Sequence, residues 1–156
     1  MERTLVLCKP DAVQRGFVGQ IVDRFERKGL KIAGLKLMRF SRELAAEMYQ
    51  MHQGKDFYEP LVEFITASPA VAIVLEGSSA VKVVRKMLGA TFGPDAEVGT
   101  IRGDFGMSKR YNLVHGSDST ESASREISLL FKPDELLDYQ IVAQKWVYAS
   151  LDGNAI

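Results

Sequence analysis

Apolar residues recur along the chain with two spacings, which predict alternating strands and helices. The clearest helix begins at Val18, where apolar residues follow at three- and four-residue intervals as far as Phe25, and Gly29 then provides a stop. Further helices are predicted after an N-cap at Ser41, around Pro60, over 81–88, over 120–130 and after the turn at 132–134. Apolar runs predict strands at 4–8, 30–40, 71–75 and near 113–114, the third of them central in its sheet.

Turn-forming residues separate these elements. Proline ends the first strand in a turn at 9–11, which leaves Lys9 at a strand end, and residues 91–99 have the composition of a loop. Alternating strands and helices predict an α/β or α+β layered fold, and the pattern alone favours a parallel, doubly wound sheet. Because periodicity does not determine strand direction, the helix hairpin between the second and third strands leaves antiparallel pairing open. No repeat or linker interrupts the chain, so we expect a single domain over 1–156.

Composition excludes several classes of protein. Hydrophobic residues at 46% and charged residues at 26% are near the averages of globular domains, which argues against disorder and membrane residence. The 20 basic and 20 acidic residues cancel, so we expect no dedicated nucleic-acid partner. The single cysteine, Cys8, lies in an apolar run and is expected to be a buried hydrophobe rather than a reactive thiol. With no signal-peptide pattern and no apolar run long enough to span a bilayer, a cytoplasmic location is expected.

Two histidines are the first candidates for chemistry. His52 lies in a polar neighbourhood and is expected to be a surface or cap residue. His115 ends an apolar run and precedes a turn-forming stretch, so its ring is expected to stand in an open site. Lys9, Arg85 and Arg102 are cations without a compensating charge run nearby, although most such residues are simply solvated. Glycine-rich phosphate loops are absent, so a phosphate ligand would have to be bound by side chains.

The segment 112–118, Asn-Leu-Val-His-Gly-Ser-Asp, resembles the active-site signature of the nucleoside diphosphate kinases, with every polar position occupied as in that family. The resemblance continues in the same order along nearly the whole chain, at 9–11 with 14–16, 99–105, 126–129, 131–133 and 146–148. It implies a ferredoxin-like fold, a four-stranded antiparallel sheet covered by helices. It also implies transfer of the γ-phosphate of a nucleoside triphosphate to a nucleoside diphosphate, by a ping-pong mechanism.

The resemblance implies a role for each matching residue. His115 is the expected nucleophile and forms a phosphohistidine, with Glu126 and Ser117 holding its side chain and Lys9 beside it. The residues expected around the phosphates and ribose are Lys9, Tyr49, Arg85, Thr91, Arg102 and Asn112, and Phe57 is the expected stacking platform for the base. Mg²⁺ is expected to be held mainly by the nucleotide phosphates, with Asp118 nearby. A homo-oligomer is implied, and the long tail favours a hexamer over a tetramer.

Phosphoryl chemistry supports these roles independently. Its transition state is loose and anionic, so positioning and cations do most of the work, and a neutral imidazole oriented by a carboxylate is a suitable nucleophile. A base that only stacks would be bound with little selectivity. The chain departs from the family pattern at Pro94 and Val98, in a loop where subunit contacts are expected, and at Lys109, where an apolar residue is expected beside the base.

Two other classes of function share features with this sequence. An RNA-recognition module shares the ferredoxin-like sheet, and residues 102–106 are superficially similar to its basic and aromatic motif. Asp104 stands where that module needs a stacking aromatic, and the net charge is zero, so this reading is disfavoured. A catalytically silent scaffold is disfavoured because the candidate catalytic and binding residues are all intact.

Overall fold

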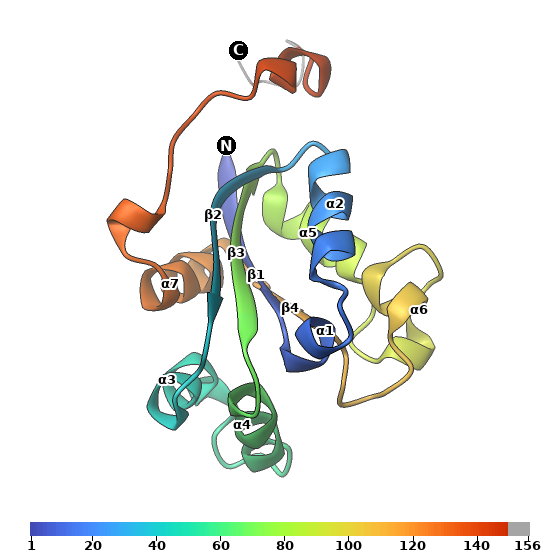
Figure 1. Cartoon of the computed structure of the whole chain (residues 1–156), viewed down its shortest axis with the longest axis vertical. Helices are drawn as coiled ribbons and strands as arrows, with labels where there is room; N and C mark the ends of the chain where they lie inside the picture. Colours follow the sequence, from blue (N-terminus) through green and yellow to red (C-terminus); the bar gives the residue numbers. More distant parts are fainter. Residues whose placement is uncertain (150–156) are drawn as a thin grey trace.

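The computed structural model describes residues 1–149. Its strands are β1 (Glu2–Cys8), β2 (Lys31–Met38), β3 (Ala70–Gly77) and β4 (Val114–Gly116). Within these residues they form a four-stranded sheet in the order β2-β3-β1-β4, and every neighbouring pair is antiparallel (Figure 1). The antiparallel, ferredoxin-like arrangement is therefore confirmed, and the parallel sheet favoured by the pattern alone is wrong.

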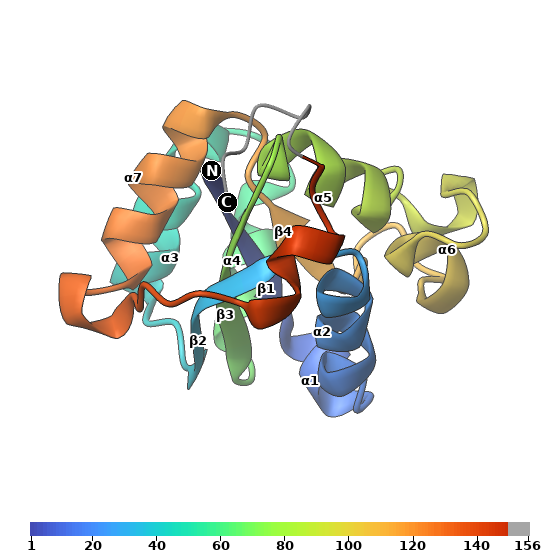
Figure 2. The ribbon, with the colours of Figure 1, turned by 90° about the horizontal axis from the view of Figure 1, so that it is seen from above.

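Helices cover both faces of the sheet. They are α1 (Pro10–Gln14), α2 (Val18–Arg27), α3 (Arg42–Met48), α4 (Tyr58–Thr66), α5 (Ala80–Leu88), α6 (Ile101–Phe105) and α7 (Thr120–Leu130). Short 3₁₀ turns are η1 (Gln50–His52), η2 (Gly93–Asp95), η3 (Pro133–Glu135) and η4 (Val142–Trp146). Figure 2 shows α3 and α7 on one side of the sheet and α2 and α5 on the other.

Successive side chains of β1 point to opposite faces of the sheet, so they divide the core between these two layers of helices. Leu5 and Leu7 belong to a cluster with buried residues of α3, α4 and α7, whereas Val6 and Cys8 belong to one with α2 and α5. Burial, together with the negative charge of Asp11, raises the pKa of the Cys8 thiol to about 12. Cys8 is thus the buried hydrophobe that the sequence predicted.

Elements with strong periodicity were predicted correctly and short ones were not. The helices α2, α3, α4, α5 and α7 are confirmed, and the Ser41 side chain caps α3 by accepting from the Leu44 backbone N–H at 3.1 Å. The five-residue helices α1 and α6 fall where a turn or no element was expected. Helices of this length complete little more than one turn, so they carry no repeating apolar signal.

The position of the fourth strand is also corrected. Leu113 does not belong to it, and His115 is its central residue rather than the residue that follows it. β4 pairs with β1 along one side only and forms an edge of the sheet, with Leu7 opposite His115. This short edge strand presents the histidine beside an open margin of the fold.

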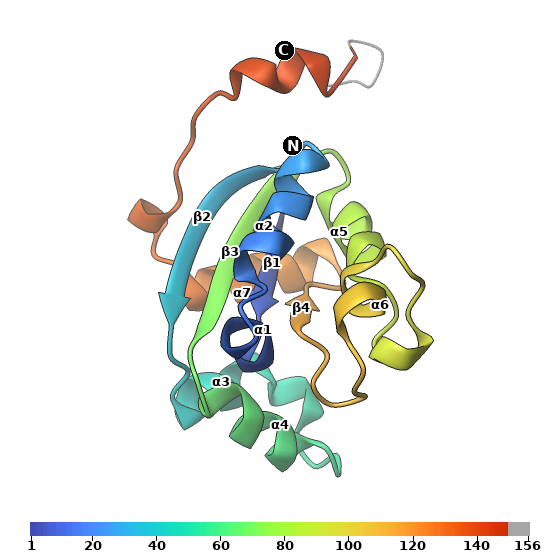
Figure 3. The same ribbon diagram turned by 45° about the vertical axis from the view of Figure 1, so that its right-hand side comes forward.

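The C-terminal tail runs back past the edge strand β2 to the end of the sheet where the N-terminus lies (Figure 3). Tyr148 is held there because its hydroxyl accepts a hydrogen bond from the Ser78 backbone N–H at 3.2 Å. The sequence also predicts a loose tail after residues 146–148, and this prediction falls mostly on residues 150–156, which lie outside the described residues. Over residues 1–149, no helix combines the length and apolar character needed to cross a membrane.

Candidate active site

His115 is held by a carboxylate from the neighbouring helix. Its side chain is 22% exposed, and its Nε2 lies 3.0 Å from Oε2 of Glu126 on α7. The same carboxylate oxygen accepts a hydrogen bond from the Ser117 hydroxyl at 2.7 Å. Ser117 in turn accepts from the Leu5 backbone N–H at 3.3 Å, which ties this group of side chains to the central strand β1.

Glu126 is nearly buried, with 5% of its side chain exposed, yet it is a carboxylate. Burial acts to raise its pKa, but the hydrogen bond and charge of His115, the Ser117 hydroxyl and the Arg125 guanidinium outweigh burial and leave the pKa below its usual value. A carboxylate can only accept, so the Nε2 of His115 carries the proton of this hydrogen bond. When the ring carries this one proton, its lone pair is on Nδ1, which makes no hydrogen bond within residues 1–149.

Lys9 is a buried cation beside this pair. Its Nζ donates to the Asn112 side-chain oxygen at 2.8 Å, and the Asn112 amide nitrogen donates to the Thr91 carbonyl at 2.8 Å. Burial and the positive charge of Arg102 lower the pKa of Lys9 to about 8, against the opposing effect of Asp11. A lysine in this environment can change its charge near neutral pH.

Arg102 is committed mainly to backbone carbonyls. Its guanidinium donates to the carbonyl oxygens of Asn112 at 3.1 Å, Gly89 at 2.9 Å and Val114 at 2.7 Å. Burial and the nearby charge of Arg85 lower the pKa of Arg102 to about 10. The residue therefore carries charge into the site and also links its own helix α6 to Gly89 and to residues 112–114.

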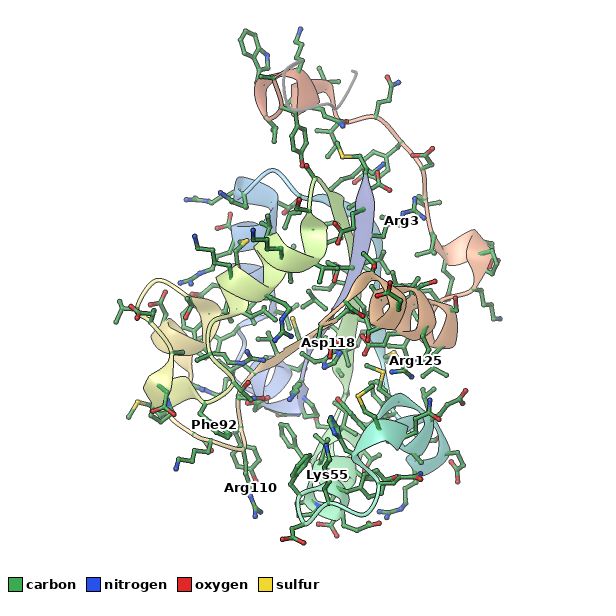
Figure 4. All side chains as sticks on the ribbon, turned by 180° about the vertical axis from the view of Figure 1, so that it is seen from behind. Arg3, Lys55, Phe92, Arg110, Asp118 and Arg125 are labelled. Carbon is green, nitrogen blue, oxygen red and sulfur yellow. The ribbon has the colours of Figure 1, made fainter. Side chains whose placement is uncertain are left out.

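These residues share a cavity of about 1000 Å³, a size typical of ligand sites. The expected residues that line it are Lys9, Tyr49, Phe57, Arg85, Thr91, Arg102, Asn112, His115, Asp118 and Glu126. Ser117 lies behind them, fully buried against Glu126. In Figure 4, Phe92 and Arg110 lie near each other, Lys55 lies beside α4, and Asp118 lies beside α7.

Aromatic rings form one wall of the cavity. The Tyr49 ring lies edge-on to His115 with centroids 6.2 Å apart, and His52 lies between Tyr49 and Phe57, at 6.3 Å and 5.2 Å. Phe57 is 49% exposed, as an available stacking surface should be. Burial and the negative charge of Glu126 raise the pKa of Tyr49, so its buried hydroxyl stays protonated and can donate.

His52 was expected on the surface, but it is half-buried and lines the cavity. The sequence offered one signal, because His52 stands three residues after Tyr49 and so falls near it on one helical face. Phe64 and Tyr111, whose rings are 5.0 Å apart, also line the cavity and were not anticipated.

Of the three departures from the family pattern, Lys109 lines the cavity, whereas Pro94 and Val98 do not. The Nζ of Lys109 lies 6.0 Å from the centre of the Phe92 ring. Val98 is 90% exposed on the loop that also contains Pro94. The cation thus lies at the rim, where its charge remains in contact with solvent.

A family model described as nucleoside diphosphate kinase matches residues 2–136. The chain belongs to the nucleoside diphosphate kinase family. The nucleoside diphosphate kinase of Staphylothermus marinus is 56% identical over 138 residues, which cover 88% of this chain and 98% of the relative. That of Pyrococcus furiosus is 55% identical over 151 residues, covering 95% and 93%.

A solved structure agrees with the sequence relatives. The structure of a halophilic nucleoside diphosphate kinase from Halobacterium salinarum in complex with CDP matches with a TM-score of 0.93 at 51% identity, covering 95% of this chain and 99% of that one. As a member of this family the chain is a kinase that transfers the γ-phosphate of a nucleoside triphosphate to a nucleoside diphosphate. Membership of this family supports the kinase over the RNA-recognition and silent-scaffold alternatives.

Proposed function

We propose that this transfer proceeds in two half-reactions through a phosphohistidine on His115. The observation that supports it most strongly is the Nε2 to Glu126 contact of 3.0 Å, which holds the ring and leaves the Nδ1 lone pair available. In the first half-reaction Nδ1 attacks the γ-phosphorus, the bond to the β-phosphate oxygen breaks, and the nucleoside diphosphate leaves. In the second, a β-phosphate oxygen of the acceptor attacks the same phosphorus and the bond to Nδ1 breaks.

Glu126 and Ser117 orient the nucleophile in this proposal. As phosphorus bonds to Nδ1, positive charge develops on the ring, and the buried carboxylate stabilises it while the proton stays on Nε2. Ser117 fixes the carboxylate through its 2.7 Å hydrogen bond. No proton has to leave the site in either half-reaction.

The cations and polar groups around the cavity bind the nucleotide. Lys9, Arg85 and Arg102 balance the charge of the phosphates, while Thr91, Tyr49 and Asn112 offer hydrogen bonds to phosphate or ribose. The exposed ring of Phe57 stacks on the base, which is consistent with weak base selectivity. We infer that nucleoside di- and triphosphates are the ligands of this cavity.

A magnesium ion fits the same arrangement. No cluster of three or more metal-ligating side chains occurs among residues 1–149, so a cage built by protein alone is not offered there. Asp118 lines the cavity, and its hydrogen bond from Ser122, followed by the backbone and nearby positive charges, keeps its pKa low against a weaker effect of burial. Mg²⁺ would be held mainly by nucleotide phosphates with Asp118 nearby, and when bound it neutralises phosphate charge.

We further infer a homo-oligomer, with a hexamer favoured over a tetramer. The tail packs on its own chain, yet Val142 and Trp146 remain 88% and 84% exposed, which supports a role in bracing a neighbouring subunit. Native mass measurement distinguishes the two assemblies. The single, buried cysteine is consistent with the reducing cytoplasm, which we propose as the location.

The covalent mechanism is tested by incubating the protein with Mg²⁺ and a nucleoside triphosphate labelled on the γ-phosphate, without an acceptor. We expect label in a bond that acid cleaves and base does not, which is the behaviour of phosphohistidine. Initial rates should follow ping-pong kinetics, since donor and acceptor occupy the same cavity in turn. Acid-stable label, or intersecting initial-rate lines, would contradict the proposal.

A further inference from the structure

The backbone just before His115 adopts an unusual conformation. Leu113 has a φ of +69°, and the Val114 N–H donates to the Asn112 carbonyl at 2.7 Å. These features define a γ-turn of the rarer kind, whose central residue has positive φ and is strained when it carries a side chain. Leu113 lies in the turn, directly between a residue proposed to bind nucleotide and the strand that carries the nucleophile.

Both backbone polar groups of Leu113 are held from one short segment that follows β1. The Leu113 carbonyl accepts from the Lys9 backbone N–H at 2.8 Å. The Leu113 N–H donates to the Asp11 carboxylate oxygen Oδ2 at 3.0 Å. Arg102 completes the support, because its guanidinium donates to the carbonyls on either side of Leu113, those of Asn112 and Val114.

Asp11 is an unusual residue to find in this place. Its other oxygen, Oδ1, is buried and has no hydrogen-bond partner within residues 1–149. Burying a carboxylate oxygen without a partner is unfavourable, so the position is not explained by the stability of Asp11 alone. Strained backbone persists only where its surroundings determine it, and here the Asp11 carboxylate is the side-chain acceptor for the strained residue.

We propose that Asp11 is a positioning residue for phosphoryl transfer, which holds the γ-turn at Leu113 and thereby sets the place of His115. The inference rests on the proposed function, in which His115 is the reacting group. Nδ1 has to meet phosphorus with close control of distance and direction, and a shift of about 1 Å can slow an oriented reaction on the order of 10²-fold. Asp11 touches neither the nucleophile nor, in this proposal, the nucleotide.

The proposal separates transfer from binding. Asn112 is held by its own contacts with Lys9, Thr91 and Arg102, none of which involves Asp11. The base and phosphate contacts of Phe57 and Arg85 arise from other elements. Because the charge of Asp11 acts to raise the pKa of Lys9, the variants are compared at a pH well below 8, where Lys9 is protonated. Under that condition, loss of the Asp11 acceptor should slow phosphorylation of His115 at saturating nucleotide and leave the affinity for a nucleoside diphosphate nearly unchanged.

Two conservative variants distinguish the acceptor from the charge. Asp11→Asn keeps an oxygen at the same reach but loses the charge, whereas Asp11→Glu keeps the charge but displaces the acceptor by the length of one methylene. Asp11→Ala removes both. Glu135→Ala is a matched control, because Glu135 also accepts a backbone N–H, that of Lys132 at 2.8 Å, in the η3 turn and away from the cavity.

The measurement is the rate of phosphoenzyme formation by rapid quench at saturating nucleoside triphosphate, beside calorimetric affinity for a nucleoside diphosphate. We expect Asp11→Asn and Glu135→Ala to stay within about 3-fold of the parent rate, and Asp11→Glu and Asp11→Ala to lose on the order of 10-fold to 10²-fold, with affinities changed by less than about 3-fold. If Asp11→Ala fails to fold, the proposal is judged by whether Asp11→Asn forms the phosphoenzyme faster than Asp11→Glu.

The inference is overturned if Asp11→Asn is as slow as Asp11→Glu, if Asp11→Glu is as fast as the parent, or if the losses appear in affinity alone. Failure of the underlying mechanism gives a different result, because the parent itself would then form no acid-labile phosphoenzyme.

Discussion

Replacing Glu126 by Gln tests how much the buried carboxylate contributes to catalysis. The side chain keeps its shape but loses the charge that accepts from His115 Nε2 at 3.0 Å and from Ser117 at 2.7 Å. A hydrogen bond to a charged group contributes about 1.5–3 kcal/mol, and one between neutral groups about 0.5–1.5 kcal/mol. The difference of about 1–1.5 kcal/mol corresponds to a rate loss of roughly 5-fold to 13-fold.

A second effect acts in the same direction. If the new amide turns its nitrogen to His115, Nε2 must accept, the ring proton moves to Nδ1, and the nucleophilic lone pair is lost. We therefore expect phosphoenzyme formation at saturating nucleoside triphosphate to fall by about 10-fold or more. The affinity for a nucleoside diphosphate should be nearly unchanged, because only 5% of the Glu126 side chain is exposed and its carboxylate is already engaged by His115 and Ser117.

The assay is rapid quench with a labelled nucleoside triphosphate, beside calorimetric titration of a nucleoside diphosphate. Glu121→Gln is the matched control, because Glu121 lies on the same helix α7 and is exposed to solvent. That control should keep the parent rate. A Glu126→Gln protein that is phosphorylated within about 2-fold of the parent rate would refute the assigned orienting role.

Three other substitutions probe the rest of the site. Arg102→Ala should lower the rate of transfer on the order of 10²-fold or more. It should also lower the melting temperature, because three backbone carbonyls, among them that of Asn112, lose their donor. An unchanged melting temperature would contradict this second expectation. Phe57→Ala should weaken nucleoside diphosphate binding by about 1–3 kcal/mol in calorimetry, and equal affinity would remove the ring from the site. The lowered pKa of Lys9, about 8, means that its ammonium is present below that pH and lost above it, so nucleotide affinity should fall as pH rises through about 8. In Lys9→Met this fall in nucleotide affinity near pH 8 should vanish. An identical pH profile of affinity in the parent and in Lys9→Met would count against the role of Lys9.

Much of the fold was predictable because its long elements repeat a signal. The helix from Val18 shows apolar residues on one face over several turns, and the central strand β3 is a continuous apolar run that is buried from both sides. Strand direction was not predictable in this way, since parallel and antiparallel strands share the same two-residue alternation. The family resemblance supplied the antiparallel order.

The identities of the site residues were predictable, but several of their contacts were not. Resemblance pointed to Arg102 as a phosphate-binding cation, yet nothing in the sequence shows that its guanidinium spans the carbonyls of Asn112 and Val114. The sequence does not predict the turn at Leu113 either, because leucine is an unfavourable residue for positive φ. Both features depend on contacts that the folded chain creates: the Arg102 side chain reaches carbonyls 10 and 12 residues away, and the Leu113 N–H reaches the Asp11 carboxylate across 102 residues of sequence.

The most direct test of the covalent mechanism uses the two histidines of the chain as a pair. The parent, His115→Ala and His52→Ala are each incubated with Mg²⁺ and a γ-labelled nucleoside triphosphate, and acid-labile label is measured beside calorimetric binding of a nucleoside diphosphate. We expect label on the parent and on His52→Ala, and none on His115→Ala, which should still bind nucleotide through Lys9, Arg102 and Phe57. Acid-labile label on His115→Ala, or its loss from His52→Ala alone, would contradict the account.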